Sequence, residues 1–242
     1  MNKNLAIFVP MANEENNAEK LIKDIFNYER FFNKFKLFII IDNVSKDNTI
    51  KIVKNLEKEF KNLKLIWAPE NKNVVEAYIK GYKTCLETNY EWILELDAGN
   101  THNPSDFKYF LPEMDKDYDC ILGSRFCKKG KMLNASYMRI ILSLGGSYLT
   151  KLFFKINLKD TTSGFQLFRR RVLNKIIAKG IISRDRFFQT EIKIYLRKMK
   201  IKEMPISYTC QKDTKNFPLK IILESIFLLF KLRIMKENYI NE

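Results

Sequence analysis

The sequence predicts an α/β fold in which a mostly parallel, Rossmann-like sheet is flanked by helices. Short apolar runs recur through the first half of the chain, at residues 5–9, 37–41, 63–67, 92–96 and 120–122. Their hydrophobicity is continuous rather than alternating, which is typical of strands covered on both faces. The segments between the runs carry apolar residues at helical spacing, as Ile50, Val53 and Leu56 do. Alternating strands and helices predict parallel pairing through right-handed crossovers.

Length and composition favour one domain. With 242 residues, 46% of them hydrophobic, the chain can bury one large core but is short for two. The N-terminal MNKNLAIFVP has too short an apolar run for a signal peptide or a membrane span, which predicts a cytoplasmic protein. The four cysteines form no CxxC pair and there is one histidine, so buried free thiols are expected rather than a zinc site.

The net charge of +15 calls for an anionic partner or serves solubility. Nucleic acid, anionic lipid and phosphorylated substrates all satisfy this charge. The basic residues are dispersed and carry no nucleic-acid motif, so we expect no nucleic-acid partner.

Polar clusters follow the predicted strands at the edge where a parallel sheet binds its ligands. Glu14 follows the first strand, Asp42 the second and Asp97 the fourth. Acids also stabilise helix N-termini, and Ser45 or Asp47 could simply cap the next helix. Carboxylates at several strand ends on one rim nevertheless favour a binding site over capping alone.

Motifs along nearly the whole chain resemble inverting family 2 glycosyltransferases, most closely the dolichol-phosphate (polyprenyl-phosphate) mannosyl- and glucosyltransferases. They are VPMANEEN (9–16), IDNVSKDNT (41–49), LDAGNTHNP (96–104), GSRF (123–126), DTTSGF (160–165), FQTE (188–191) and EMPISY (203–208). The resemblance implies a GT-A-type nucleotide-binding fold in a single domain, 1–242. A nucleotide-sugar-binding half would span about 1–125, an acceptor half about 126–215 and a C-terminal amphipathic helix, interfacial or packed, about 216–242.

The resemblance also implies roles for individual residues. The nucleotide-sugar-binding residues would be Pro10, Asn13, Glu14, Asp42, Asn43, Asp97, Ala98 and Gly99. Asp42 would accept a hydrogen bond from a ring N–H of uracil or guanine. Asp97 would reach the diphosphate through Mg²⁺ or Mn²⁺, which prefer oxygen ligands. The catalytic residues would be Asp97, Arg125, Asp160 and Glu191, and Arg125 and Lys212 would bind an acceptor phosphate.

The chain departs from the family pattern at the expected metal site. Gly99 stands where the family has a second aspartate, and Thr101 stands at the third ligand position. A bound cation is therefore expected to be weak or absent, unless Asn100 or Asp160 compensates. Near the C-terminus an arginine-rich family motif is replaced by residues 211–216, where Lys212 or Lys215 could substitute. For Arg125 the alternative is an ordinary surface arginine.

Two kinds of acceptor are compatible with the sequence. A phosphate acceptor is already ionised, whereas a sugar hydroxyl needs a general base. The chain lacks the Glu-Asp pair that supplies this base in many relatives, which favours a polyprenyl phosphate; Glu191 keeps open a hydroxyl of a surface glycan, unless it forms a helix-surface ion pair.

The apolar segment 217–233 is too short and too charged for a confident membrane span and predicts an interfacial helix or one packed on the domain. A second apolar segment, 138–154, could lie beside it, and the alternative is that both helices are core elements. Together with the +15 charge they predict peripheral attachment to the anionic inner face of a membrane. A protein that binds nucleotides or nucleic acid without transferase activity is the remaining hypothesis.

Overall fold

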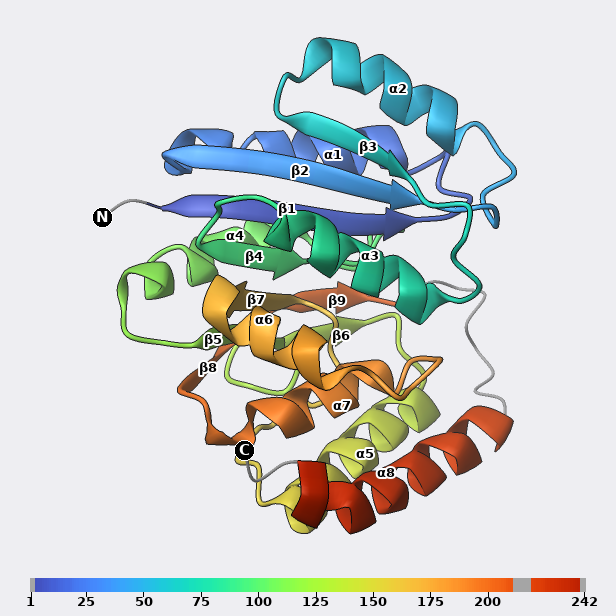
Figure 1. The fold of residues 1–242 in the computed structure, drawn as a ribbon, viewed down its shortest axis with the longest axis vertical. Helices are drawn as coiled ribbons and strands as arrows, with labels where there is room; N and C mark the ends of the chain where they lie inside the picture. The colour runs from blue at the N-terminus through green and yellow to red at the C-terminus, as the bar shows by residue number, and fades with distance from the viewer. Residues whose placement is uncertain (1–2, 211–218, 240–242) are drawn as a thin grey trace.

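A computed structural model describes residues 3–210 and 219–239, and Figure 1 shows its central sheet with helices on both faces. The seven-stranded sheet has the order β3-β2-β1-β4-β7-β5-β8. Its strands are β1 (Asn4–Met11), β2 (Lys34–Ile41), β3 (Leu63–Trp67), β4 (Trp92–Glu95), β5 (Cys120–Ser124), β7 (Gln166–Arg169) and β8 (Ile201–Pro205). Each apolar run predicted as a strand forms one.

The sheet is mostly parallel, as predicted. β1 pairs in parallel with β2 and β4, β2 pairs in parallel with β3, and β5 pairs in parallel with β8. Only β7, among the strands of this sheet, runs antiparallel to its neighbours β4 and β5. The carboxyl ends of β1, β2 and β4 therefore lie along one edge, where the predicted acidic clusters meet.

Helices cover both faces of the sheet and bury a separate apolar cluster on each. Figure 1 shows α3 and α6 in front of the sheet, with α1 and α4 behind it. The longer helices are α1 (Ala18–Phe26), α2 (Thr49–Glu59), α3 (Val74–Leu86), α5 (Tyr137–Phe154), α6 (Arg170–Lys179), α7 (Phe188–Tyr195) and α8 (Leu219–Tyr239). The shorter ones are η1 (Glu29–Phe31), η2 (Pro104–Asp106), α4 (Phe107–Phe110), η3 (Glu113–Asp115) and η4 (Leu196–Lys198). Residues of α3, α5, α6, α7 and α8 share one cluster, and residues of α1, α2 and α4 the other.

A small second sheet joins the end of β5 to the region after β8. It pairs β6 (Lys131–Leu133) in parallel with β9 (Ser207–Thr209). An isolated bridge between His102 and Tyr208 ties this ribbon to the loop after β4. Loops far apart in the sequence are thus held at the same end of the main sheet.

Helices α5 and α8 pack against each other at the edge of the fold, at the bottom of Figure 1. At their contact, the rings of Phe153 on α5 and Phe230 on α8 form an edge-to-face pair with centroids 5.1 Å apart. Within the described part of the chain, no helix is both long enough and apolar enough to cross a membrane. Of the cysteines, Cys85, Cys120 and Cys210 are buried free thiols as expected, whereas Cys127 is partly exposed.

Candidate functional site

Hydrogen bonds made by the backbone and side chain of Asn13 join the loops that follow β1 and β2. Asn13 has a positive φ of 57°, a conformation that asparagine tolerates better than most residues. Its backbone N–H donates to Ser45 Oγ (3.1 Å), its Nδ2 donates to the Val44 carbonyl (3.2 Å) and its Oδ1 accepts from the Lys46 N–H (2.8 Å). These contacts occupy the Asn13 side-chain amide and hold the two loops together.

Glu14 and Asp47 complete this joined pair of loops. The Glu14 N–H donates to Thr49 Oγ1 (2.8 Å), and Glu14 Oε2 accepts from Asn17 Nδ2 (2.9 Å). Burial raises the pKa of the Glu14 carboxyl, against the lowering effect of the Asn17 hydrogen bond. Asp47 Oδ1 accepts the Thr49 N–H (3.0 Å) at the start of α2, but the N-cap residue is Asn48, and its side chain makes no capping hydrogen bond.

Asp42, Asn43 and Pro10 lie at the strand ends beside these loops. Asp42 is only 7% exposed, and its Oδ1 accepts from the Val44 N–H (3.0 Å). Its other oxygen accepts no hydrogen bond from a described residue, so it remains available to a ligand. Asn43 Nδ2 donates to the Pro69 carbonyl (2.9 Å), which fixes the loop after β2, and Pro10 is half-buried at the end of β1.

Asp97 follows β4 and is oriented by an aromatic and an imidazole partner. Tyr78 on α3 donates its hydroxyl to Asp97 Oδ1. The Asp97 backbone N–H donates to His102 Nδ1 (3.2 Å), which places the ring proton of a neutral His102 on Nε2. Burial lowers the pKa of His102 despite the nearby Asp97, which favours that neutral form. The Asp97 side chain remains 27% exposed and can therefore meet a ligand.

The turn after Asp97 uses the residues that could have supplied further metal ligands. Gly99 and Asn100 have φ of 72° and 53°, so two consecutive residues are left-handed. Asn100 Nδ2 donates to Asn17 Oδ1 (2.8 Å), and Thr101 Oγ1 donates to the carbonyl of the half-buried Ala98 (2.8 Å). Among the described residues there is no cluster of three or more His, Cys, Asp or Glu side chains suited to a metal ion.

Arg125 and Asp160 form a buried bidentate ion pair. Arg125 Nε and Nη2 donate to Asp160 Oδ2 and Oδ1, both at 2.7 Å, and the Arg125 backbone N–H donates to Oδ2 at 2.9 Å. Burial disfavours the charged carboxylate, but Arg125 outweighs this and holds the pKa of Asp160 below its usual value. The alternative of a surface arginine is wrong, since Arg125 is 6% exposed. Asp160 is also a poor substitute metal ligand because Arg125 occupies both its oxygens.

Arg139 is a candidate site residue that sequence reasoning missed. The guanidinium groups of Arg125 and Arg139 both lie over the Tyr208 ring, at 5.3 Å and 5.7 Å from its centroid. Arg139 Nη2 also donates to the Tyr208 hydroxyl (3.1 Å), and His102 packs edge-to-face on the same ring at 5.3 Å. Tyr208 therefore links both arginines to the Asp97 loop. Arg139 lies in the first turn of α5, where an apolar helix pattern gave it no special signal.

Glu191 is fully buried, so the predicted alternative of a helix-surface ion pair is wrong. Its carboxylate accepts the backbone N–H groups of Ile182 (2.8 Å) and Ser183 (2.9 Å) and the hydroxyl of Tyr195 (2.7 Å). These bonds fix the segment before α7 onto that helix. A carboxylate held by so many donors is poorly placed to act as a general base.

A buried polar group lies beneath Asp97, and no sequence signal singled it out. Glu95, at the end of β4, accepts hydrogen bonds from Tyr82 and Gln189, and burial raises its pKa to about 8 against these two lowering contacts. Lys193 on α7 is also fully buried, and burial lowers its pKa to about 8 against the attraction of Asp160. Glu95 stands in the apolar run 92–96, which predicts a strand, and Lys193 lies two residues after the FQTE motif.

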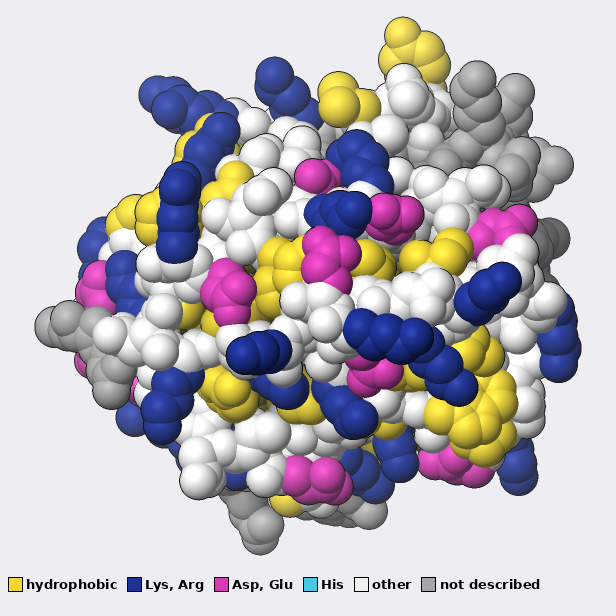
Figure 2. All heavy atoms as spheres, turned by 90° about the horizontal axis from the view of Figure 1, so that it is seen from above, with side chains coloured by type: hydrophobic (Ala, Val, Ile, Leu, Met, Phe, Trp, Pro, Cys, Tyr) yellow, Lys and Arg dark blue, Asp and Glu magenta, His cyan; other side chains and the backbone are white. Residues whose placement is uncertain are grey.

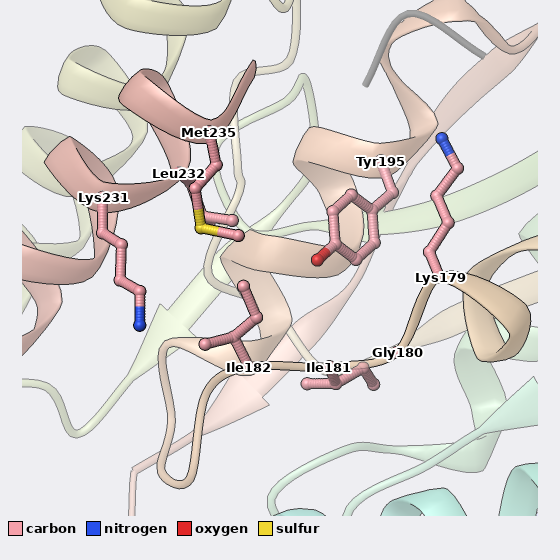
Figure 3. A pocket seen from close by; sticks show the side chains of 8 residues that line it. All are labelled: Lys179, Gly180, Ile181, Ile182, Tyr195, Lys231, Leu232 and Met235. Atoms are coloured by element: carbon pink, nitrogen blue, oxygen red, sulfur yellow. The ribbon is translucent and has the colours of Figure 1, made fainter. Parts of the chain in front are cut away.

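A hollow lies beside the Glu191 contacts, since Ile182 and Tyr195, which both donate hydrogen bonds to Glu191, line it. It is a cavity of about 310 Å³ between α8 and the segment after α6. In Figure 3 the Tyr195 hydroxyl points inward among the side chains that line it. Ile181, Ile182, Leu232 and Met235 line it, with Lys179 and Lys231. It contains no predicted site residue. Lys212, predicted to bind an acceptor phosphate, lies outside the described residues.

A family model and curated relatives identify the kind of protein. The model for glycosyl transferase family 2 matches residues 6–177. The chain is similar to an undecaprenyl-phosphate mannosyltransferase of Micrococcus luteus, with 27% identity over 172 residues that cover 70% of each protein. It is 29% identical over 216 residues to a dolichyl-phosphate beta-glucosyltransferase of Trichomonas vaginalis, covering 84% of this chain and 65% of the relative. It spans about half (51%) of a Mycolicibacterium smegmatis polyprenol monophosphomannose synthase, at 27% identity over 135 residues, 55% of this chain.

Solved structures agree with the fold. The glucosyl-3-phosphoglycerate synthase of Mycobacterium tuberculosis in complex with UDP has a TM-score of 0.69, at 12% identity, with 96% of this chain and 80% of that chain covered. The same enzyme with Mn²⁺, UDP and phosphoglyceric acid gives a TM-score of 0.70, at 12% identity, with 99% and 80% covered. These likenesses and the sheet order confirm the predicted GT-A-type fold, and the family match confirms the resemblance drawn from the motifs.

Proposed function

The chain belongs to glycosyltransferase family 2, and on this premise we propose that it transfers a hexose from a nucleotide-sugar to a polyprenyl phosphate, with inversion. An oxygen of the acceptor phosphate forms the new bond to the anomeric carbon from the face opposite the diphosphate. The old carbon–oxygen bond breaks, and the nucleoside diphosphate leaves with its electron pair. The curated relatives named above, which carry polyprenyl-phosphate or dolichyl-phosphate names, support this acceptor class.

The observation that carries the proposal is the pair of arginines on Tyr208. Arg125 and Arg139 stack on one ring, which bridges to His102 and hence to the Asp97 loop. Arg125 Nη1 makes no hydrogen bond to a described residue, so it can donate to a phosphate oxygen while Asp160 holds the rest of the fork. Guanidinium groups suit phosphate, and an ionised phosphate needs positioning rather than a base. The occupied oxygens of Glu191 disfavour the hydroxyl acceptor, which would need that base.

The donor would bind at the other end of the same edge, across the proposed half of residues 1–125. Asp42 has a carboxylate oxygen available for a base N–H, and the loops joined by Asn13 would shape the nucleotide pocket. Residues 126–215 would form the proposed acceptor half. A divalent cation fits this chain with Asp97 as its protein ligand, because Mg²⁺ often takes one or two carboxylates and completes its shell with substrate phosphates and water. Such a cation would neutralise charge on the leaving diphosphate.

Helices α5 and α8 would place the site at a membrane face. Both expose apolar side chains at helical spacing: Ile141, Tyr148 and Leu152 on α5, and Phe227, Phe230 and Ile234 on α8. Exposed basic residues, among them Lys151, Lys155 and Arg233, accompany them. Apolar stripes with basic neighbours are the pattern of helices that lie in an anionic bilayer interface. Peripheral attachment to the cytoplasmic face is therefore part of the proposal.

The proposed acceptor is tested by supplying UDP- and GDP-hexoses with either a polyprenyl phosphate or a glycan hydroxyl acceptor. We expect a hexosyl polyprenyl phosphate product, and its loss in Asp97→Asn. Asp24→Asn is the matched control, since Asp24 lies on α1 in an exposed ion pair with Lys20. Transfer to the glycan hydroxyl without transfer to the lipid phosphate would contradict the proposal.

A further inference from the structure

We propose that Lys193 is a positioning residue for the transfer reaction. Its buried amino group holds the main chain of residues 160–164, which we call the acidic loop, against Asp97. The catalytic meaning of this role rests on the proposed function, but the contacts that support it do not.

The surroundings of Lys193 are unusual for a lysine. The side chain is completely buried, and Nζ donates to the carbonyls of Ser163 (2.6 Å) and Gln189 (3.3 Å). Burying an amino group costs free energy unless its hydrogen bonds and charge are compensated. The hydrogen-bond partners of Lys193 Nζ are two main-chain carbonyls. Its amino group therefore holds backbone in place instead of forming a surface ion pair.

The acidic loop is held from several elements, and Lys193 holds its end nearest Asp97. At the other end Arg125 binds Asp160. In the middle, Ser147 on α5 accepts the Thr161 N–H (3.0 Å), and Thr190 on α7 donates to the Thr161 carbonyl (3.1 Å). Lys193, one turn after Thr190, donates to the Ser163 carbonyl (2.6 Å), whereas the Ser163 hydroxyl accepts only the more local Phe165 N–H (3.4 Å) among the described residues.

Gly164 shows why the position of Ser163 matters. A Cβ atom built on Gly164 would lie 2.8 Å from Asp97 Oδ1 and 3.0 Å from Gln189 Nε2. The loop backbone is therefore packed directly against the carboxylate that meets the donor. A small displacement of Ser163 moves Gly164 relative to Asp97. By fixing Ser163, Lys193 therefore also fixes the position of the backbone that packs against the Asp97 carboxylate.

The test compares Lys193→Met, which keeps length and removes the donor, with Ile194→Val on the same helix. Ile194 is fully buried, so its variant reports the effect of a modest loss of core packing. Lys193→Gln, which keeps an N–H donor without a buried charge, serves as a second variant should the Met variant fold poorly. Each is measured for kcat, for donor KM and for amide hydrogen exchange of the peptide covering residues 160–165.

We expect Lys193→Met to lower kcat by about 10- to 100-fold, as misplacement of a reacting group does, with donor KM changed less than about twofold. Amide exchange should rise in residues 160–165 in Lys193→Met and, by a smaller factor, in Lys193→Gln, and stay unchanged in Ile194→Val. An unchanged kcat, or faster exchange spread evenly over the chain, would overturn the inference. If the wild type transfers no hexose, the proposed function fails. The structural part of the inference is judged separately by amide exchange, and unchanged exchange of residues 160–165 in Lys193→Met would overturn it.

Discussion

Asp97 and Asp160 are both acids of the site, yet their surroundings prepare them for different tasks. Asp160 is fully buried and its two oxygens are bound by the Arg125 fork. Asp97 is partly exposed and is held by Tyr78 on one side and by its own N–H to His102 on the other. Asp160 is thus suited to orient an arginine, and Asp97 to meet a ligand.

Replacing Arg125 by Met should destabilise the fold by about 3–5 kcal/mol, because it leaves Asp160 buried without its cation. Burial would then raise the pKa of Asp160 in the variant. The folded variant would bind more protons than the unfolded chain, so its stability should fall as pH rises above about 4. In the wild type the pKa of Asp160 is lowered, so the stability contributed by its paired carboxylate is present above the pKa of Asp160 in the unfolded chain. This stability is lost only as pH falls through the lowered pKa of the folded protein. Urea unfolding at pH 4.5 and 7 should show a cost that grows with pH.

A second substitution checks whether the lost stability of Arg125→Met comes from the unpaired charge on Asp160. Adding Asp160→Asn to Arg125→Met removes the unpaired charge, so the double variant should be more stable at pH 7 than Arg125→Met alone. Equal stability of the single and double variants would mean that the ion pair is not the source of the effect.

Gly164→Ala should lower transfer activity and stability together. The added methyl would meet Asp97 Oδ1 at 2.8 Å, and overpacking of this kind costs about 1–3 kcal/mol. Gly145→Ala is the matched control, because nothing lies within 4 Å of its Cβ position and Ala favours the α5 helix. Thermal unfolding and an initial-rate assay measure both effects. A Gly164→Ala protein as active as Gly145→Ala would show that the loop can move away freely.

At the scale of elements, α7 and the pair α5 and α8 use opposite patterns. α7 turns Gln189, Thr190 and Lys193 into the protein, where they hold the acidic loop and Glu95. α5 and α8 instead leave large apolar side chains exposed, such as Tyr148 (67%) and Phe227 (65%). Polar residues inside and apolar residues outside are costly for ordinary packing, so both patterns point to function.

Tyr148→Glu combined with Phe227→Glu should weaken binding to anionic phospholipid vesicles by at least about tenfold, because each ring contributes about 1.5–3 kcal/mol when buried. Vesicle flotation measures the change. Phe31→Glu is the control, since Phe31 is 47% exposed on η1 rather than on either helix. Unchanged flotation, together with self-association that the double variant abolishes, would assign this surface to a second copy of the chain.

At the scale of the whole molecule, one continuous sheet connects the proposed donor and acceptor halves. β1 to β5 come from residues before 125, while β7 and β8 come from later residues, and β7 lies between β4 and β5. The loop before β7 is therefore held beside the loop after β4. The +15 charge is a property of the whole surface: on the face over α2, Figure 2 shows basic side chains spread among acidic and apolar ones.

Nucleotide binding should stabilise the whole fold. A ligand at 100 times its Kd adds about 2.7 kcal/mol, which corresponds to about 5–10 °C in Tm for a chain of this size. We expect UDP or GDP to raise Tm, and Mn²⁺ to raise it further only with the nucleotide, because Asp97 alone is a weak cation ligand. Differential scanning fluorimetry with each addition measures this. A shift with Mn²⁺ alone would reveal a cation site built by the protein itself, and an equal shift with and without Mn²⁺ would reject donor binding through Asp97 and a metal.

The predictable part of the site was its rim. Continuous apolar runs predict where the strands end, and parallel pairing brings those ends to one edge of the sheet. This is enough to place Asp42 and Asp97 at the same edge without knowledge of any side-chain contact. The ordered motifs further identified the family. Side-chain partners were not predictable, since Arg125 meets an acid 35 residues away and Glu191 turns into the protein.

The sequence by itself determined the alternation of strands and helices, the family and the acids at the strand ends, because these depend on local patterns and on motif order. Only the tertiary structure decided that Arg125 is paired with Asp160, that Arg139 shares the Tyr208 ring, and that Lys193 holds Ser163. Such contacts join residues on different elements, and hydrophobic periodicity says which face is buried but not which residue it meets.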